Sequence, residues 1–302
     1  RYMGATLVLK HQLTQVVCRI NAVAMILVGL IAAFYGPYEL FVIYLFSEGG
    51  RFYYQGFGYG SLWFAALLLQ IIAYYGIAAV LLPLGFGHLK FRRWALTLTQ
   101  LFLWFWLGAG ILIGVNGILL MPTLFRDGLH QVFPYLQWPE IIVASLISCL
   151  ILPALGLWVY KSRWVKGVFS EHDSEIYWTE KYPIPLMATL VLFFLMIIVM
   201  HFAIILQGVF PVFGQINLMR DSAPIIAGCI LVLVGLIYGT VKLKPWAWWV
   251  SLVFVTLLTI STFMSFSKYN LSEITQMMHL PAAEIAYFEK LPPLHHVYLT
   301  GL

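Results

Sequence analysis

The sequence predicts an all-α protein: a polytopic bundle of about seven transmembrane helices that contains repeated helical hairpins. Of the 302 residues, 62% are apolar and 10% are charged, whereas soluble domains carry about 25% charged residues. The apolar residues form runs that reach the roughly 20 residues needed to cross a bilayer. Two short strings of basic residues and tryptophan also recur between such runs, 152 positions apart. We therefore expect an integral membrane protein without a sizeable soluble domain.

Seven apolar runs bounded by charged and turn residues are the predicted spans. They cover approximately residues 20–46, 61–84, 94–121, 140–160, 184–210, 223–241 and 246–266. The first run contains Gly36-Pro37, and proline lacks the backbone donor that a helix interior requires. We therefore expect the first helix to break there and residues 38–46 to form a separate interfacial or re-entrant piece. The first 17 residues predict an interfacial segment and lack the pattern of a signal peptide.

Predicted spans two to seven pair into three hairpins, 61–121, 140–210 and 223–266, within a transmembrane domain of residues 1–266. The turn of the first hairpin reads Lys90-Phe91-Arg92-Arg93-Trp94, and that of the third reads Lys242-Leu243-Lys244-Pro245-Trp246. Aligning the two tryptophans also aligns Gly87 with Gly239. This match predicts that the first and third hairpins are copies of one unit. The middle hairpin has a weaker version of the string, Lys161-Ser162-Arg163-Trp164.

The basic residues predict the orientation of the spans. Of the 17 lysines and arginines, twelve fall on the side of the N-terminus and of the basic-tryptophan strings, and five on the other side. Cytoplasmic loops carry the excess of lysine and arginine, so the N-terminus is predicted to be cytoplasmic and the C-terminus to lie outside. The clean segregation of charge, without an organelle-targeting segment, favours the bacterial inner membrane.

The two stronger basic-tryptophan strings are interpreted as membrane anchors. Basic side chains at a helix end extend to lipid phosphates, and tryptophan prefers the headgroup level. The predicted anchoring residues are Lys90, Arg92, Arg93, Trp94, Lys242, Lys244 and Trp246. An alternative role for these strings is to bind an anionic lipid or a partner subunit. If they are anchors, Trp94 and Trp246 lie at similar membrane depth.

His201 is the candidate cofactor-binding residue, because it lies in the middle of an apolar run and polar groups at that depth usually face a partner. Its imidazole is able to bind a haem iron or a chlorophyll magnesium. The alternative is a hydrogen bond to a neighbouring helix. The other histidines fall at interfaces or in loops, so the paired ligands of a transmembrane cytochrome are not evident, and the sequence identifies no cofactor.

Catalytic and metal-binding motifs are absent from the sequence. Cys18, Cys149 and Cys229 are scattered and lack metal-ligand spacing. An outer group of Arg126, Asp127 and His130 suggests a polar site, although a salt-bridged loop cap is the simpler account. An enzyme is therefore disfavoured, and no catalytic or metal-binding residue is predicted.

The remaining segments are the loops and the tail. Residues 47–60 alternate glycine with aromatic residues, which favours a contact at the membrane surface. Residues 161–183 form the longest inner connection and are the expected inner docking surface. Residues 267–302 are predicted to be an extracytoplasmic tail, in which a short interfacial helix starts at Pro281 and ends near Leu291.

The sequence supports two functional hypotheses. The first is a structural or accessory subunit of a larger membrane protein assembly, based on the aromatic surface, the glycine-aromatic loop and the missing catalytic motifs. The alternative is a binding or carrier protein that holds a hydrophobic small molecule, such as a lipid, a quinone or a tetrapyrrole pigment, between its helices. The expected partners are membrane lipids and other membrane subunits, and nucleic acid is not expected.

Overall fold

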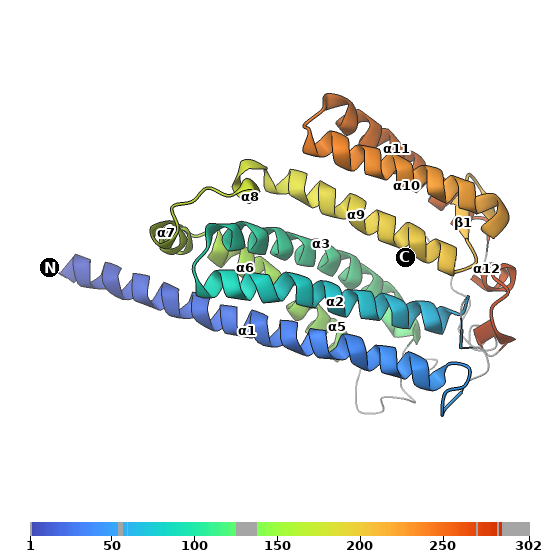
Figure 1. The fold of residues 1–302 in the computed structure, drawn as a ribbon, viewed down its shortest axis with the longest axis horizontal. Helices are drawn as coiled ribbons and strands as arrows, with labels where there is room; N and C mark the ends of the chain where they lie inside the picture. The colour runs from blue at the N-terminus through green and yellow to red at the C-terminus, as the bar shows by residue number, and fades with distance from the viewer. Residues whose placement is uncertain are drawn as a thin grey trace. The chain divides into compact units, whose positions relative to one another are not determined.

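The protein is mainly helical, as the computed structural model shows for residues 2–53, 57–58, 60–124, 138–269, 271–282 and 284–285 (Figure 1). The membrane-length helices are α1 (Tyr2–Phe46), α2 (Leu62–Leu89), α3 (Arg93–Leu124), α9 (Ile184–Ile205), α10 (Met219–Val241) and α11 (Pro245–Phe266), together with a seventh built from α5 (Trp138–Leu146), the π-helical turn η2 (Ile147–Ile151) and α6 (Leu152–Tyr160). The shorter elements are α7 (Arg163–His172), α8 (Trp178–Lys181), β1 (Phe210–Val212), β2 (Gln215–Asn217) and α12 (Leu271–Met277).

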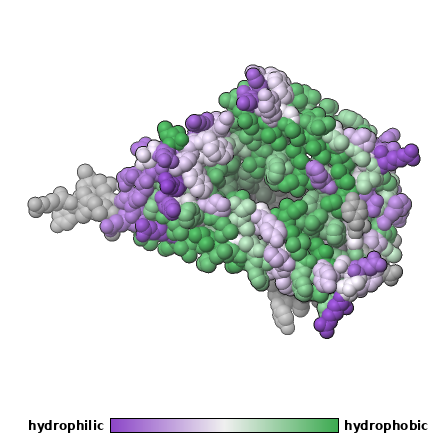
Figure 2. All heavy atoms as spheres, in the orientation of Figure 1, coloured by the Kyte–Doolittle hydropathy of each residue, from purple (hydrophilic) through white to green (hydrophobic). Residues whose placement is uncertain are grey.

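The predicted fold class is confirmed. In the part of the chain that the structure describes, seven helices are long and apolar enough to cross a membrane, and each falls on one of the seven predicted runs. Most of the visible surface is apolar, and hydrophilic side chains gather over α7 (Figure 2). The chain is therefore an integral membrane protein.

The predicted break at Pro37 is wrong, because α1 continues from Tyr2 to Phe46 with Pro37 inside it. Residues 38–46 are thus no separate piece, and residues 2–17 belong to the same helix. Proline is tolerated inside transmembrane helices because neighbouring helices and local adjustments compensate for the lost backbone bond. Gly36 lies against α2, where a Cβ atom would come within 2.8 Å of the Tyr75 ring. Packing at this point keeps α1 continuous.

The chain divides into two compact units. Unit 1 consists of Arg1–Val42, Leu68–Gly114 and Val143–Met187, and unit 2 consists of Ile43–Leu67, Val115–Ile142 and Ala188–Leu302. In unit 1 a buried apolar cluster joins α1, α3, α6 and α7 with the turn after α2. Its members are Cys18, Phe91, Leu103, Leu157, Tyr160, Val165, Val168 and Phe169. This cluster holds the basic ends of the unit 1 helices together.

In unit 2 a β-hairpin formed by β1 and β2 is fixed to α11. The strands are antiparallel, with Phe210 opposite Asn217 and Val212 opposite Gln215. The hydroxyl of Ser261 accepts a bond from the Phe213 N–H at 2.9 Å and donates to the Pro211 carbonyl at 2.9 Å. Ser265 makes the same two kinds of bond, with the Gly214 N–H at 3.0 Å and the Gln215 carbonyl at 3.1 Å. An isolated two-stranded hairpin is marginal in water, so these serines account for its persistence.

The described part of the tail folds onto the rest of unit 2. Ile274, Met278 and Leu280 are buried in a cluster that also includes Leu62 and Leu206. The helix predicted to start at Pro281 is present at its first residues, since the N–H groups of residues 284 and 285 bond to the Pro281 carbonyl. Its remaining length, to about residue 291, lies outside the described residues.

The turns of the first and third hairpins have the same backbone geometry. Each contains one residue in the left-handed region, Phe91 with φ 48° and Leu243 with φ 52°. The N–H of the following residue bonds to the carbonyl of a helical glycine, at 2.8 Å for Gly87 and 2.9 Å for Gly239. This six-to-one bond is the mark of a Schellman helix end. A Cβ atom on either glycine would lie 2.6 to 3.0 Å from the tryptophan and alanine at the start of the next helix. Both turns therefore require glycine at this position, where the two helices of the hairpin approach closely.

The middle basic-tryptophan string forms a different turn. Lys161 and Ser162 both have negative φ, and Ser162 caps a new helix at once by accepting the Val165 N–H at 3.3 Å. That helix, α7, is followed by α8 before α9 begins. Spans four and five are therefore joined by a folded connection instead of a tight turn.

Candidate functional site

The first basic turn binds the connection between α6 and α9. The N–H of Arg93 donates to Asp173 at 3.1 Å, and the guanidinium of Arg92 lies 3.6 Å from the same carboxylate. The Arg93 guanidinium pairs with Glu180 at 2.5 Å. The ammonium of Lys90 lies over the Phe86 ring, 4.4 Å from its centroid. Two of the predicted anchoring residues thus hold a protein segment in place, and their anchoring role stays a prediction.

The second basic turn has a different surface. Lys242 and Lys244 are exposed, and Trp246 is 47% exposed. Pro245 occupies the position equivalent to Arg93, and proline supplies neither an N–H donor nor a cation. Trp248 and Trp249 are 67% and 63% exposed. Cations beside exposed tryptophan rings are the arrangement expected at the headgroup level, so the second turn suits the predicted anchor better than the first.

His88 is buried in unit 1, whereas its position in the sequence predicts an interface or a loop. Its Nδ1 lies 2.8 Å from the Leu84 carbonyl and therefore donates to it. Its ring meets the edges of Tyr160 and Phe169 at centroid distances of 5.4 and 5.2 Å. The burial results from α7 folding back over the end of α2, a contact between distant segments that local sequence does not specify.

A polar network around Tyr160 joins three helices of unit 1. The Tyr160 hydroxyl accepts a hydrogen bond from the Asn21 side chain of α1. The Tyr160 carbonyl accepts a bond from the Gln100 side chain of α3 at 2.8 Å. Buried polar groups are costly unless they are paired, so this network specifies how α1, α3 and α6 pack.

His201, the predicted cofactor ligand, is exposed on α9. Its Nδ1 lies 2.7 Å from the Ile197 carbonyl of the preceding turn. Among the described residues, no group of three or more histidine, cysteine, aspartate or glutamate side chains is placed to hold a metal ion. Ligation by His201 stays a prediction. The polar group of Arg126, Asp127 and His130 lies outside the described residues.

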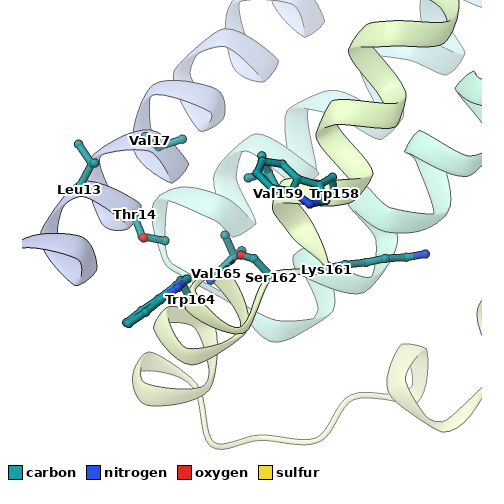
Figure 3. A pocket seen from close by; sticks show the side chains of 9 residues that line it. All are labelled: Leu13, Thr14, Val17, Trp158, Val159, Lys161, Ser162, Trp164 and Val165. Atoms are coloured by element: carbon teal, nitrogen blue, oxygen red, sulfur yellow. Dashed lines mark hydrogen bonds between the residues drawn. The ribbon is translucent and has the colours of Figure 1, made fainter. Parts of the chain in front are cut away.

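A groove of about 710 Å³ opens at the basic end of unit 1 (Figure 3). Helices α1, α6 and α7 and the turn between the last two line it. The lining residues are Leu13, Thr14, Val17, Trp158, Val159, Lys161, Ser162, Trp164 and Val165. The middle basic-tryptophan string, which is a weaker version of the other two, forms one wall of the groove.

Local sequence explains the two walls. On α1, positions 10, 13, 14 and 17 fall on one face because helical neighbours are three or four residues apart. On α7, the cap at Ser162 starts a helix whose buried residues Val165, Val168 and Phe169 share the inner face. This spacing predicts an amphipathic helix and was the signal available in the sequence. The meeting of the two walls depends on a long-range contact.

The groove lies near the ends of two apolar spans. The apolar run of α1 starts at about residue 20, and the candidate span of α5, η2 and α6 ends at Tyr160. The Lys10 ammonium lies 5.6 Å from the centroid of the Trp164 ring, which places a positive charge beside the groove wall. Lys161 turns its ammonium away, over the Trp104 ring of α3 at 4.7 Å (Figure 3). The groove thus has apolar walls and a cationic rim.

Asp173 lies buried in the connection next to the groove. Burial acts to raise the pKa of this carboxyl, but hydrogen bonds from the N–H groups of Arg93 and Glu175, together with the charge of Arg92, hold the pKa below its usual range. A lowered pKa in the folded state stabilises the protein above the unfolded value of about 3.9. That contribution is lost as the pH falls through the folded value.

Replacing Asp173 with asparagine should therefore lower the unfolding temperature at neutral pH. The difference between the wild type and Asp173→Asn should be constant above about pH 5 and shrink below about pH 4, because the wild-type carboxyl then becomes protonated. Thermal unfolding in detergent across this pH range measures the difference. A difference that stayed unchanged down to pH 3 would show that the charge of Asp173 does not stabilise the fold.

The comparisons with known proteins add no family to these observations. No protein-family model matches the chain, and no curated protein or solved structure shows significant similarity to it.

Proposed function

We propose that the protein binds a hydrophobic or amphipathic small molecule taken from the membrane, and that this molecule is a lipid held in the groove of α1, α6 and α7. The observation that carries the proposal is a largely apolar cavity of about 710 Å³ at the ends of two spans. Binding pockets for small molecules are typically about 300–1,000 Å³ and mainly apolar, with a few polar groups. The groove fits this description.

A lipid fits the groove better than a tetrapyrrole. Leu13 and Trp158, on its two sides, are 62% and 76% exposed, so an occupant with flexible apolar chains has access from the lipid phase. The polar groups, Thr14, Ser162 and the nearby Lys10, lie at the end where the spans stop. A tetrapyrrole needs an axial ligand, and none of the groove residues is histidine.

Filling the groove should remove the bound lipid. Val17→Trp places an indole where we expect an acyl chain, so the purified protein should retain about one lipid fewer than the wild type in native mass spectrometry. Val16→Trp is the matched control, because Val16 and Val17 are 52% and 47% exposed on the same helix and Val16 does not line the groove. Equal lipid retention by the wild type and Val17→Trp, with both folded, would contradict the proposal.

An accessory membrane subunit is the second candidate, and the outer face of α10 favours it. A Cβ atom added at Gly228 or Gly235 would meet no atom within 4 Å, and Leu231 between them is 72% exposed. Small residues that leave a helix backbone open allow another helix to approach closely. Under this hypothesis Gly235→Leu should release copurifying subunits in mild detergent, and a wild type that purifies without partners would contradict it.

We also propose that the N-terminus is cytoplasmic and that the first and third hairpins are copies of one unit. The charge distribution favours a cytoplasmic N-terminus, most consistent with a bacterial inner membrane, and the matched turns at Gly87 and Gly239 favour duplication of one hairpin. If the orientation is correct, a maleimide that cannot cross membranes should label Ser267→Cys but not Ser170→Cys in intact cells. The reverse pattern would overturn the orientation.

A further inference from the structure

We infer that the groove selects an anionic phospholipid over a zwitterionic one, and that the ammonium of Lys10 pairs with the lipid phosphate. The inference rests on the proposed function, because it names the class of lipid that the same groove takes. It follows from the charges around the groove, from the state of the nearby carboxylates and from the distance between Lys10 and the apolar walls.

The segments that build the groove carry charge of one sign. Residues 10–19 and 158–166 include five lysines and arginines and no aspartate or glutamate. Lys10 itself is exposed, and its ammonium lies beside the Trp164 ring. Among the described residues no carboxylate lies within 4.0 Å of Lys10 as an ion-pair partner. The positive charge at the rim is therefore available to an external anion.

The acidic residues of the neighbouring connection are engaged elsewhere. Asp173 is bound by Arg92 and Arg93, and Glu180 pairs with Arg93. Glu175 accepts the hydroxyl of Tyr177 at 2.9 Å. Glu171 lies 3.3 Å from the ring nitrogen of His11. The first basic turn thus engages two of these carboxylates, and none of the four is an ion-pair partner of Lys10.

The spacing along α1 matches the shape of a phospholipid. Lys10 and Val17 are seven residues apart on one face, which is about 10 Å at 1.5 Å per residue. A phosphate at Lys10 therefore places the glycerol near Thr14 and the acyl chains beside Val17 and Trp158. The Ser162 hydroxyl, which also lines the groove, remains able to donate to the headgroup while it accepts the Val165 N–H.

The test compares two lipids on the full-length protein. Delipidated protein in mild detergent is mixed with equal amounts of phosphatidylglycerol and phosphatidylcholine that have the same acyl chains, and native mass spectrometry counts the lipid that stays bound. The wild type should retain phosphatidylglycerol about fivefold more than phosphatidylcholine, as expected for one surface lysine. Lys10→Gln should still retain a lipid but lose the preference. Lys268→Gln is the matched control and should keep the preference, because Lys268 is an exposed lysine of unit 2 outside the basic-tryptophan strings.

The outcomes separate this inference from the proposed function. If the wild type retains both lipids equally while Val17→Trp still loses one, the groove binds lipid but the anionic preference is wrong. If Lys10→Gln keeps the wild-type preference, the assignment of the phosphate to Lys10 is wrong. If Val17→Trp retains as much of each lipid as the wild type, the proposed function itself fails. The comparison of phosphatidylglycerol with phosphatidylcholine on the wild type requires no variant. It therefore tests the anionic preference even if a variant misfolds.

Discussion

Replacing Gly110 with alanine should destabilise the protein severely, by about 3 kcal/mol or more. A Cβ atom at this position would lie 2.0 Å from the carbonyl oxygen of Cys149 and 2.6 Å from its carbonyl carbon. Cys149 belongs to the π-helical turn η2, so the obstacle is backbone and not the end of a flexible side chain. Either α3 or η2 would have to move. Thermal unfolding in detergent, followed by circular dichroism, measures the loss.

Gly108 provides the matched control for this prediction. It lies two residues earlier in the same helix, and a Cβ atom there would meet nothing within 4 Å. Gly108→Ala should be neutral or stabilising by up to about 1 kcal/mol, because alanine favours a helix more than glycine does. If the two variants unfolded at the same temperature, the close approach of α3 to η2 would be disproved.

Replacing Glu284 with alanine should release the tail from the start of α2. The Glu284 carboxylate is 1% exposed and accepts the N–H groups of Leu62 and Trp63 at 3.0 and 3.1 Å. The first N–H groups of a helix have no partner within it, and a carboxylate there also interacts favourably with the helix dipole. Losing charge-assisted hydrogen bonds of this kind costs about 3 kcal/mol. Trypsin should therefore cut faster after the exposed Lys268.

The control for the tail is Glu48→Ala. Glu48 is an exposed glutamate of unit 2, so its loss should leave both the cleavage rate and the unfolding temperature unchanged. Glu284→Gln keeps one carbonyl acceptor and should fall between the wild type and Glu284→Ala. A wild-type cleavage rate in Glu284→Ala would show that the carboxylate does not hold the tail.

The sequence was sufficient to predict the seven spans because bilayer thickness imposes a length that hydropathy reveals. It also identified the paired turns, since Gly87 and Gly239 are required by the close approach of the next helix. The break expected at Pro37 did not occur. Gly36 packs against Tyr75 of α2, and a tertiary contact of this kind is not visible in the local sequence. The sequence did not predict the β-hairpin either, because its hydrogen bonds to Ser261 and Ser265 of α11 join segments about fifty residues apart.

The candidate site was less predictable from the sequence. The basic residues were identified, but Arg92 and Arg93 bind carboxylates eighty residues or more away, a pairing that no local pattern reveals. The middle basic-tryptophan string resembles the other two least, yet it borders the groove. Ser162 in this string caps the new helix α7, whereas Phe91 in the first string lies in a tight turn between two spans. Residues 13–17 and 158–165 form a cavity only after α7 folds back over the bundle end.

A density map of the protein in nanodiscs that contain phosphatidylglycerol tests the central claim most directly. The account predicts elongated non-protein density between Val17 and Trp158, with its headgroup end at Lys10. Direct packing of Leu13 and Val17 against Trp158 and Trp164, with no density between them, would contradict it.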